Sequence, residues 1–308
     1  MNDRKVKNVA ASVRQRLLNF AQASGRPFQE VLQYFAMERF LYRLSQSPQA
    51  DKFELKGALM LTVWGASAIR PTKDIDLLSH MSNSVETLAD VIRDVCRQDV
   101  EPDGLAFDAG SVAGRVIKED ADYEGVRINF RGALQNVPLP MQIDVGFGDT
   151  VFPCSEMIEF PTILDHGPPR LRGYSRETTV AEKFEAMAKL GLLNSRMKDF
   201  FDIWLLARQF DFDGPTLTSA VERTFANRGT AVFANPTAFT DAFGTDATKQ
   251  AQWQAFLRKS HLTFAPASLL QIVDFVASFL RPVAAALESN SPFTYRWQAP
   301  GPWVTKQA

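Results

Sequence analysis

Apolar and polar positions divide the chain into a helical start, a strand-rich middle and a helical second half. Residues 6–47 carry apolar residues at near-helical spacing on both sides of a Gly25–Arg26–Pro27 break, so two helices are expected there. Residues 82–98 predict an amphipathic helix. The alternation that follows predicts three strands, at 111–117, 124–134 and 140–147.

The periodicity becomes helical again from about residue 178. Residues 177–191 start with acidic residues and end on Gly191, which is typical of a complete helix. A second helix is expected over 195–210, with an apolar stripe along one side. Three further helices are expected near 215–227, 248–258 and 267–287. The Pro-rich tail from Asn290 is expected to drape over the surface.

The most informative stretch is LKGALMLTVWGASAIRPTKDIDLL, from Leu55 to Leu78. Asp74 and Asp76 alternate with apolar residues, which predicts a short strand with both carboxylates on one face. Two adjacent carboxylates repel each other, so the pattern favours a divalent cation between them, and Mg²⁺ prefers carboxylates together with phosphate oxygens. Upstream, Gly57 predicts a tight turn into a helix whose N–H groups could face an anion. The alternative is a surface turn, because Asp-x-Asp is common by chance.

The net charge of the chain is close to zero, but two segments carry a strong excess of one sign. The 308 residues are 45% hydrophobic and carry a net charge of −1, so a full core is expected and no overall basic field attracts nucleic acid. Residues 74–124 hold 13 acids and 4 bases, whereas residues 170–198 hold 7 bases and 3 acids. An acidic, metal-holding part followed by a basic part suits a metal–triphosphate substrate, although charge runs are often only solvated faces.

The remaining composition favours a cytoplasmic protein. Cys96 and Cys154 are far apart and lack metal-ligand spacing, which suggests a reducing compartment. The first twelve residues contain no apolar signal core. The most apolar helix, near 269–287, contains Asp274, Arg281 and Pro282, so it is expected to be too broken to span a membrane.

The order strand, Gly turn, short helix and Asp-x-Asp strand resembles the nucleotidyltransferase superfamily related to DNA polymerase beta. That resemblance implies that Gly57 and the next residue hold a triphosphate, with Mg²⁺ or Mn²⁺ on Asp74 and Asp76. Ala58 departs from the usual Gly or Ser, which removes a hydroxyl contact but keeps the backbone N–H. Asp144 lies alone in an apolar strand, which is costly unless it is paired or bound to a cation, and it matches the superfamily's third carboxylate. A strand-end Asp beside a turn is the plainer interpretation.

Three later motifs resemble the AbiEii/AbiGii branch of nucleotidyltransferase-type toxins. They are RPTKDID from Arg70, AEKFEA around Lys183, and SRMKDFFD with Lys198, Asp199 and Asp202. The likeness covers roughly residues 50–210. It implies nucleotide contacts from Arg70, Lys183 and Lys198, and catalytic roles for Asp74, Asp76, Lys183, Asp199 and Asp202. The plain alternatives are an exposed helical Lys183 and a weak i,i+4 pair between Lys198 and Asp202.

Together these features predict an α+β protein: a nucleotidyltransferase fold with a small mixed sheet flanked by helices, plus a C-terminal helical domain. The expected parts are N-terminal bracing helices (1–48), the core (49–170) and the helical domain (171–308). The expected function is metal-dependent transfer of a nucleotide from a nucleoside triphosphate to RNA, such as a tRNA 3′ end, or to a protein. The branch also implies a toxin with a cognate antitoxin protein.

Two other functions fit parts of the sequence. A glycosyltransferase also binds a metal–nucleotide through Asp-x-Asp, although it needs neither the Gly57 turn nor Lys183. A non-catalytic binding module with the same fold is the second alternative, and the Ala58 departure supports it.

Overall fold

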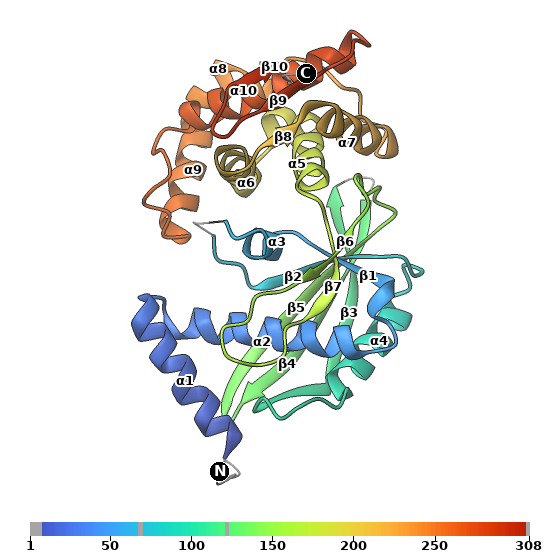
Figure 1. Cartoon of the computed structure of the whole chain (residues 1–308), viewed down its shortest axis with the longest axis vertical. Helices are drawn as coiled ribbons and strands as arrows, with labels where there is room; N and C mark the ends of the chain where they lie inside the picture. The colour runs from blue at the N-terminus through green and yellow to red at the C-terminus, as the bar shows by residue number, and fades with distance from the viewer. Residues whose placement is uncertain (1–7, 67–69, 121–122, 306–308) are drawn as a thin grey trace. The chain divides into compact units, whose positions relative to one another are not determined.

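The computed structural model describes residues 8–66, 70–120 and 123–305, and its contacts divide the chain into two compact units. Unit 1 comprises the described parts of residues 1–65, 71–148 and 156–173, and unit 2 those of 66–70, 149–155 and 174–308. Both are shown in Figure 1. The mixture of helices with one mixed sheet confirms the predicted α+β class.

Unit 1 is built on a seven-stranded mixed sheet of order β3-β4-β5-β2-β1-β7-β6. The β1–β7 and β2–β5 pairs are parallel and the other four pairs are antiparallel. The strands are β1 (Phe53–Lys56), β2 (Asp74–Ser79), β3 (Leu105–Asp120), β4 (Tyr123–Leu134), β5 (Val137–Phe147), β6 (Glu156–Glu159) and β7 (Arg170–Gly173). The helices are α1 (Val9–Ser24), α2 (Phe28–Gln46), η1 (Ala50–Lys52), α3 (Leu59–Val63) and α4 (Val85–Arg97).

One face of this sheet is apolar and carries the core of unit 1. Ile75 on β2, Ile128 on β4 and Ile143 on β5 are fully buried side chains at paired register positions. Helices α2 and α4 contact each other and the strands on this face. Phe40 of α2 packs against Phe130 of β4 with ring centroids 5.1 Å apart. Because side chains alternate along a strand, the polar residues between these positions lie on the opposite face.

The N-terminal helices and α4 form where the periodicity predicted them. Gly25 ends α1 with a left-handed φ of 68°, and the Ser84 hydroxyl accepts a hydrogen bond from Thr87 N at the start of α4. β3 begins at Leu105, six residues before the predicted start at 111. Short strands β6 and β7 were not predicted, since four residues give too little alternation to detect.

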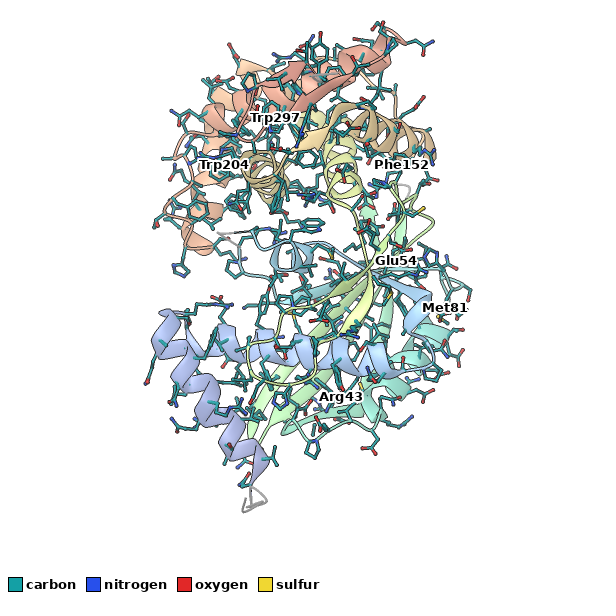
Figure 2. All side chains as sticks on the ribbon, in the orientation of Figure 1. Arg43, Glu54, Met81, Phe152, Trp204 and Trp297 are labelled. Atoms are coloured by element: carbon teal, nitrogen blue, oxygen red, sulfur yellow. The ribbon has the colours of Figure 1, made fainter. Side chains whose placement is uncertain are left out.

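Charged side chains of α2 fasten two loops of unit 1. The guanidinium groups of Arg39 and Arg43 both donate to the Asp103 carboxylate, at 3.1 Å and 2.7 Å, and all three residues are buried. Arg43 is labelled in Figure 2. Arg39 also donates to the Gly167 carbonyl, and Glu38 accepts from Ile163 N, so α2 holds the connection between β6 and β7. Burial raises the pKa of Glu38 to about 7, against the opposing effect of the Ile163 hydrogen bond and Arg39.

Unit 2 is mainly helical, as predicted for this part of the chain. Its helices are α5 (Arg176–Leu190), η2 (Gly191–Leu193), α6 (Met197–Gln209), α7 (Gly214–Asn227), η3 (Thr237–Phe239), α8 (Asp241–Thr245), α9 (Ala247–Lys259) and α10 (Leu269–Glu288). A small sheet of order β10-β9-β8 joins β8 (Phe212–Asp213), β9 (Tyr295–Trp297) and β10 (Trp303–Thr305).

The C-terminal tail lies largely exposed on unit 2, as predicted, and two buried aromatic side chains, Phe293 and Trp297, anchor it. Trp297, labelled in Figure 2, is only 2% exposed and donates to the Ala207 carbonyl of α6. Trp303 stacks on Phe279 of α10 and donates to its carbonyl. Large aromatic rings bury much apolar area and find a partner for their N–H, which fixes the tail in place.

Helix α10 continues through Pro282 and spans Leu269–Glu288, close to the helix predicted over 267–287. By length and composition alone it is the one helix among the described residues that could cross a membrane. Half of its most apolar stretch is buried inside the protein, and its buried side chains face α6, α7 and α8. A core helix of a folded domain has the same composition.

We predict that Glu38→Gln removes one pH dependence of stability. The pKa of Glu38 lies near 7 in the folded protein and near 4.5 without burial, so the free energy of unfolding should fall as pH rises from about 4.5 to about 7. The slope expected from this one proton is at most about 1.4 kcal/mol per pH unit. Chemical denaturation of both proteins across this range measures it, and equal slopes would contradict the assignment.

Candidate functional site

The Asp-x-Asp strand lies near the middle of the sheet of unit 1. β2 pairs antiparallel with β1 and parallel with β5, so neighbours on both sides fix it. Ile75 and Leu77 are buried on the core face, while Asp74 and Asp76 lie partly exposed on the opposite face. The prediction that both carboxylates share one face is therefore confirmed.

Gly57 gives Asp76 the space that it occupies. Its φ is +71°, and a Cβ atom added there would overlap Oδ2 of Asp76 and lie 2.7 Å from Cγ. Gly57 therefore serves both the turn and the close approach of the backbone to the carboxylate. Ala58 follows with its methyl group 1% exposed, and α3 then spans only five residues, so its dipole is small.

A row of charged residues crosses four strands on the face that carries Asp74 and Asp76. The register places Lys56 of β1 opposite Asp76, Asp76 opposite Asp144 of β5, and Asp144 opposite Arg127 of β4. Residues at paired positions share a face, so the order of charges is positive, negative, negative, positive. The sequence predicted the two acids of this row, whereas no motif included Arg127. Its place in an alternating strand, with polar Asn129 two residues on, was the only local sign.

Asp144 is engaged by Arg127 through both carboxylate oxygens. Arg127 Nε donates to Oδ1 and Nη2 donates to Oδ2, each at 2.7 Å. Among the described residues, no group of three or more His, Cys, Asp or Glu side chains is arranged to hold a metal ion. The role of Asp144 as a metal ligand stays a prediction, and the structure gives this carboxylate an arginine partner.

Four other predicted residues meet in unit 2, where Arg70, Asp199 and Asp202 lie around Lys183. Lys183 Nζ on α5 lies 2.8 Å from Asp199 Oδ1 and 2.8 Å from Asp202 Oδ2, both on α6. Arg70 Nε and Nη2 donate to the two oxygens of Asp202 at 2.8 Å and 3.0 Å. The side chain of Lys183 is 13% exposed, so the plain alternative of an exposed helical lysine is wrong.

Mutual charge compensation keeps these buried groups ionised. Burial alone would raise the pKa of Asp202, yet Arg70 and Lys183 lower it to about 2. Burial alone would lower the pKa of Lys183, yet Asp199 and Asp202 raise it. The Asp199 pKa is lowered in the same way, by Lys183 and then by Lys198 and Arg196. Lys198 itself is exposed. The Asp202 carboxylate pairs with Arg70 and Lys183, and not with Lys198 as the plain alternative had it.

A second buried cluster explains the acids beside Lys183. Arg228, just after α7, contacts Asp149, Glu182 and Glu185, with N–O distances of 2.8, 3.6 and 3.0 Å. These acids raise the Arg228 pKa against the effect of burial. The two glutamates that flank Lys183 in sequence therefore face an arginine more than forty residues later, which no local pattern indicates.

A family model described as "Nucleotidyl transferase AbiEii toxin, Type IV TA system" matches residues 39–276, which is 238 of the 308 residues. The chain belongs to this AbiEii toxin family. The match extends beyond the 50–210 range carried by the motifs, to α2 on one side and α10 on the other. A comparison with curated proteins gives no match.

Two solved structures from Helicobacter pylori are similar to this AbiEii family member. One is described as a candidate nucleotidyltransferase, with 14% identity and a TM-score of 0.48 over 86% of this chain and 99% of the other. The second, JHP933, has 14% identity and a TM-score of 0.47 over 85% and 97% of the two chains. The family assignment rests on the sequence match.

We predict that Gly57→Ala disturbs Asp76 directly. The added methyl group collides with the carboxylate and the positive φ is strained, so a loss of about 1–3 kcal/mol in unfolding free energy is expected. Gly65→Ala is the matched control, because φ is +70° there and nothing lies within 4 Å of the added Cβ. Calorimetric titration with Mn²⁺ should show weakened binding only in Gly57→Ala. Equal effects of both changes would show that strain alone is responsible.

We predict that Lys183→Ala destabilises the protein. Removing the lysine leaves the buried carboxylates of Asp199 and Asp202 with less positive charge, which should cost about 3 kcal/mol. Lys198→Ala, on the exposed side of α6, should change stability by less than about 0.5 kcal/mol. Denaturant unfolding of the three proteins measures the difference, and an unchanged midpoint for Lys183→Ala would contradict a structural role.

Proposed function

We propose that this protein is a metal-dependent nucleotidyltransferase that moves a nucleotide from a nucleoside triphosphate to an acceptor and acts as the toxin of its system. The observation that carries the proposal is the placing of Asp74 and Asp76 on one face of the sheet, with the Gly57 backbone against Asp76. Membership of the AbiEii family supports the same reaction class.

The donor atoms at this face suit a hard divalent cation. Asp74 and Asp76 offer carboxylate oxygens, which Mg²⁺ or Mn²⁺ prefers, and the missing Cβ of Gly57 makes room for the Asp76 carboxylate against the backbone of the turn. When bound, such a cation neutralises the carboxylates and polarises the phosphates of the nucleotide. The backbone of Gly57 and Ala58 would lie next to those phosphates, so the chain contributes mainly position and charge.

The buried lysine cluster supports a second contribution to the reaction. We propose that Lys183 and Asp199 take part in catalysis and that Arg70 and Asp202 hold them in place, since Arg70 pairs with both oxygens of Asp202. Lys198, exposed beside Asp199, would contact the nucleotide as a mobile cation. Each of these roles is assigned to a residue of the family motifs, and nucleotide transfer by single variants of each residue tests it.

Membership of the family supports a proposal for the partner, and we extend it to the acceptor and the location. The acceptor we propose is RNA, such as the 3′ end of tRNA, or a protein, and the type IV toxin–antitoxin assignment implies a cognate antitoxin. We propose that the protein acts in the cytoplasm without a membrane. Incubation with each labelled nucleoside triphosphate, Mg²⁺ and total cell RNA or protein would identify the labelled acceptor.

One alternative keeps the fold but not the chemistry. A binding module would bind nucleotide without transferring label to any acceptor, and the Ala58 departure from the usual motif favours it. The glycosyltransferase alternative loses its support, because the family match is to nucleotidyl transferases over most of the chain.

We predict that Asp76→Asn abolishes nucleotide transfer and the rise in melting temperature that Mg²⁺ causes in the wild type. The change removes one charged oxygen ligand, while the loss of repulsion from Asp74 keeps the metal-free protein at least as stable. Asp108→Asn, which alters an exposed ion pair with Arg131, is the control and should keep both properties. Wild-type transfer by Asp76→Asn would overturn the proposed function.

A further inference from the structure

Arg127 and Asp144 form an ion pair with defined geometry on the polar face of the sheet in unit 1. It is side-on, with Nε and Nη2 of the guanidinium each donating to a different carboxylate oxygen at 2.7 Å. Gln142 Nε2 adds a weaker contact to Oδ2 at 3.4 Å. Both oxygens of Asp144 are thus already hydrogen-bonded, and a bidentate pair of this kind is among the strongest polar contacts in proteins.

The pair is not symmetric in exposure. The Asp144 side chain is 11% exposed, whereas the Arg127 side chain is 28% exposed. The carboxylate is therefore the inner member, and the guanidinium is the member that the face presents. Side-on pairing also directs Nη1 away from Asp144, because the five N–H groups of arginine form a rigid fork.

The position of Arg127 relative to the Asp-x-Asp pair follows from the strand register. Asp144 lies opposite both Asp76 and Arg127, so Arg127 is two strands from Asp76. With neighbouring strands about 4.8 Å apart, the two backbone positions lie about 10 Å apart. An arginine side chain and the phosphate chain of a nucleotide bound through Asp74 and Asp76 can both reach across that distance.

Charge balance gives this arrangement a function. In the row of paired strand positions Lys56 lies opposite Asp76, and the further carboxylate of Asp144 calls for a second positive charge. Arg127 supplies that second positive charge permanently and without metal. A metal ion on Asp144 would instead have to displace both hydrogen bonds of the guanidinium and leave it unpaired.

We propose that Arg127 binds a phosphate of the metal-bound nucleotide, and that Asp144 is a positioning residue that orients Arg127 rather than a ligand of the metal. The inference rests on the proposed function, since it needs a nucleotide at Asp74 and Asp76. It assigns a phosphate contact to a residue outside every motif of the sequence. The competing interpretations are a purely structural ion pair and a third metal ligand.

The test separates metal binding from nucleotide binding. Mn²⁺ affinity is measured by calorimetry without nucleotide, and affinity for a non-hydrolysable nucleoside triphosphate is then measured with saturating Mn²⁺. The variants are Asp144→Asn, Arg127→Gln, Arg127→Lys and the Asp144→Asn/Arg127→Gln double change. Arg131→Gln is the matched control, because Arg131 lies on the same face of β4 and pairs with exposed Asp108. Thermal melting of each variant confirms that it is folded.

If Arg127 binds phosphate, Mn²⁺ affinity should stay within about threefold of wild type in every one of these variants, because none removes a metal ligand. Nucleotide affinity should fall about tenfold or more in Arg127→Gln and in Asp144→Asn, which is the range for one lost charged hydrogen bond. The double change should be no worse than Arg127→Gln, since the two residues act as one unit. Arg127→Lys should recover part of the loss, and Arg131→Gln should match the wild type.

Two results would overturn the proposal. A loss of Mn²⁺ affinity of more than tenfold in Asp144→Asn, with a gain in Arg127→Gln, would make Asp144 a metal ligand. Folded Arg127→Gln with wild-type nucleotide affinity would leave the pair only structural. Asp76→Asn, measured alongside, reports on the proposed function itself: if the wild type binds Mn²⁺ and nucleotide but this variant does not, a failure of the Arg127 variants concerns this inference alone.

Discussion

The placing of Asp74 and Asp76 on one face of a central strand is the constraint around which unit 1 is built. Two carboxylates on one strand face remain close together only when the strand cannot move, and β2 is fixed by β1 on one side and β5 on the other. The opposite face supplies the stabilisation, because Ile75 and Leu77 are buried in the core formed with α2 and α4. A slip by one residue would turn the aspartates into that core, so register is strongly specified.

The same sheet also supplies the positive charge that the aspartates need. Lys56 and Arg127 stand at the two ends of the row that contains Asp76 and Asp144, and Gly57 leaves the space that the Asp76 carboxylate fills. The metal-free face is thus nearly balanced, with two bases against the acids of β2 and β5. Charges that are paired and held in place before any ligand arrives are the form of preorganisation that the proposed phosphoryl-transfer reaction requires.

Unit 2 follows a different principle, in which charges are buried and compensated. Arg70, Lys183, Asp199 and Asp202 form one network, and Arg228 with Asp149, Glu182 and Glu185 forms another. Neither network is an efficient way to stabilise a fold, because a protein with apolar residues of similar size in place of a buried ion pair is often equally stable or more stable. Their presence among the helices of unit 2 is better explained by function or by specification of one packing arrangement. In both networks, removal of one member leaves the others buried with unbalanced charge.

The sequence by itself determined much of the local structure and the family. Helical periodicity placed α1, α2, α4, α5 and α6, and alternation around Asp74 and Asp76 placed both carboxylates on one face, because these signals lie within a few neighbouring residues. The motifs also indicated the AbiEii family correctly.

Only the tertiary structure decided which charged side chains pair with one another. Arg127 meets Asp144 through strand register, Arg70 meets Asp202 across 132 residues, and Arg228 meets Glu185 across 43, contacts that depend on chain topology and leave no periodic trace in the sequence. The low exposure of Lys183 and the burial of Trp297 in the tail were decided in the same way: burial depends on what packs against a segment, and that packing comes from residues remote in the chain.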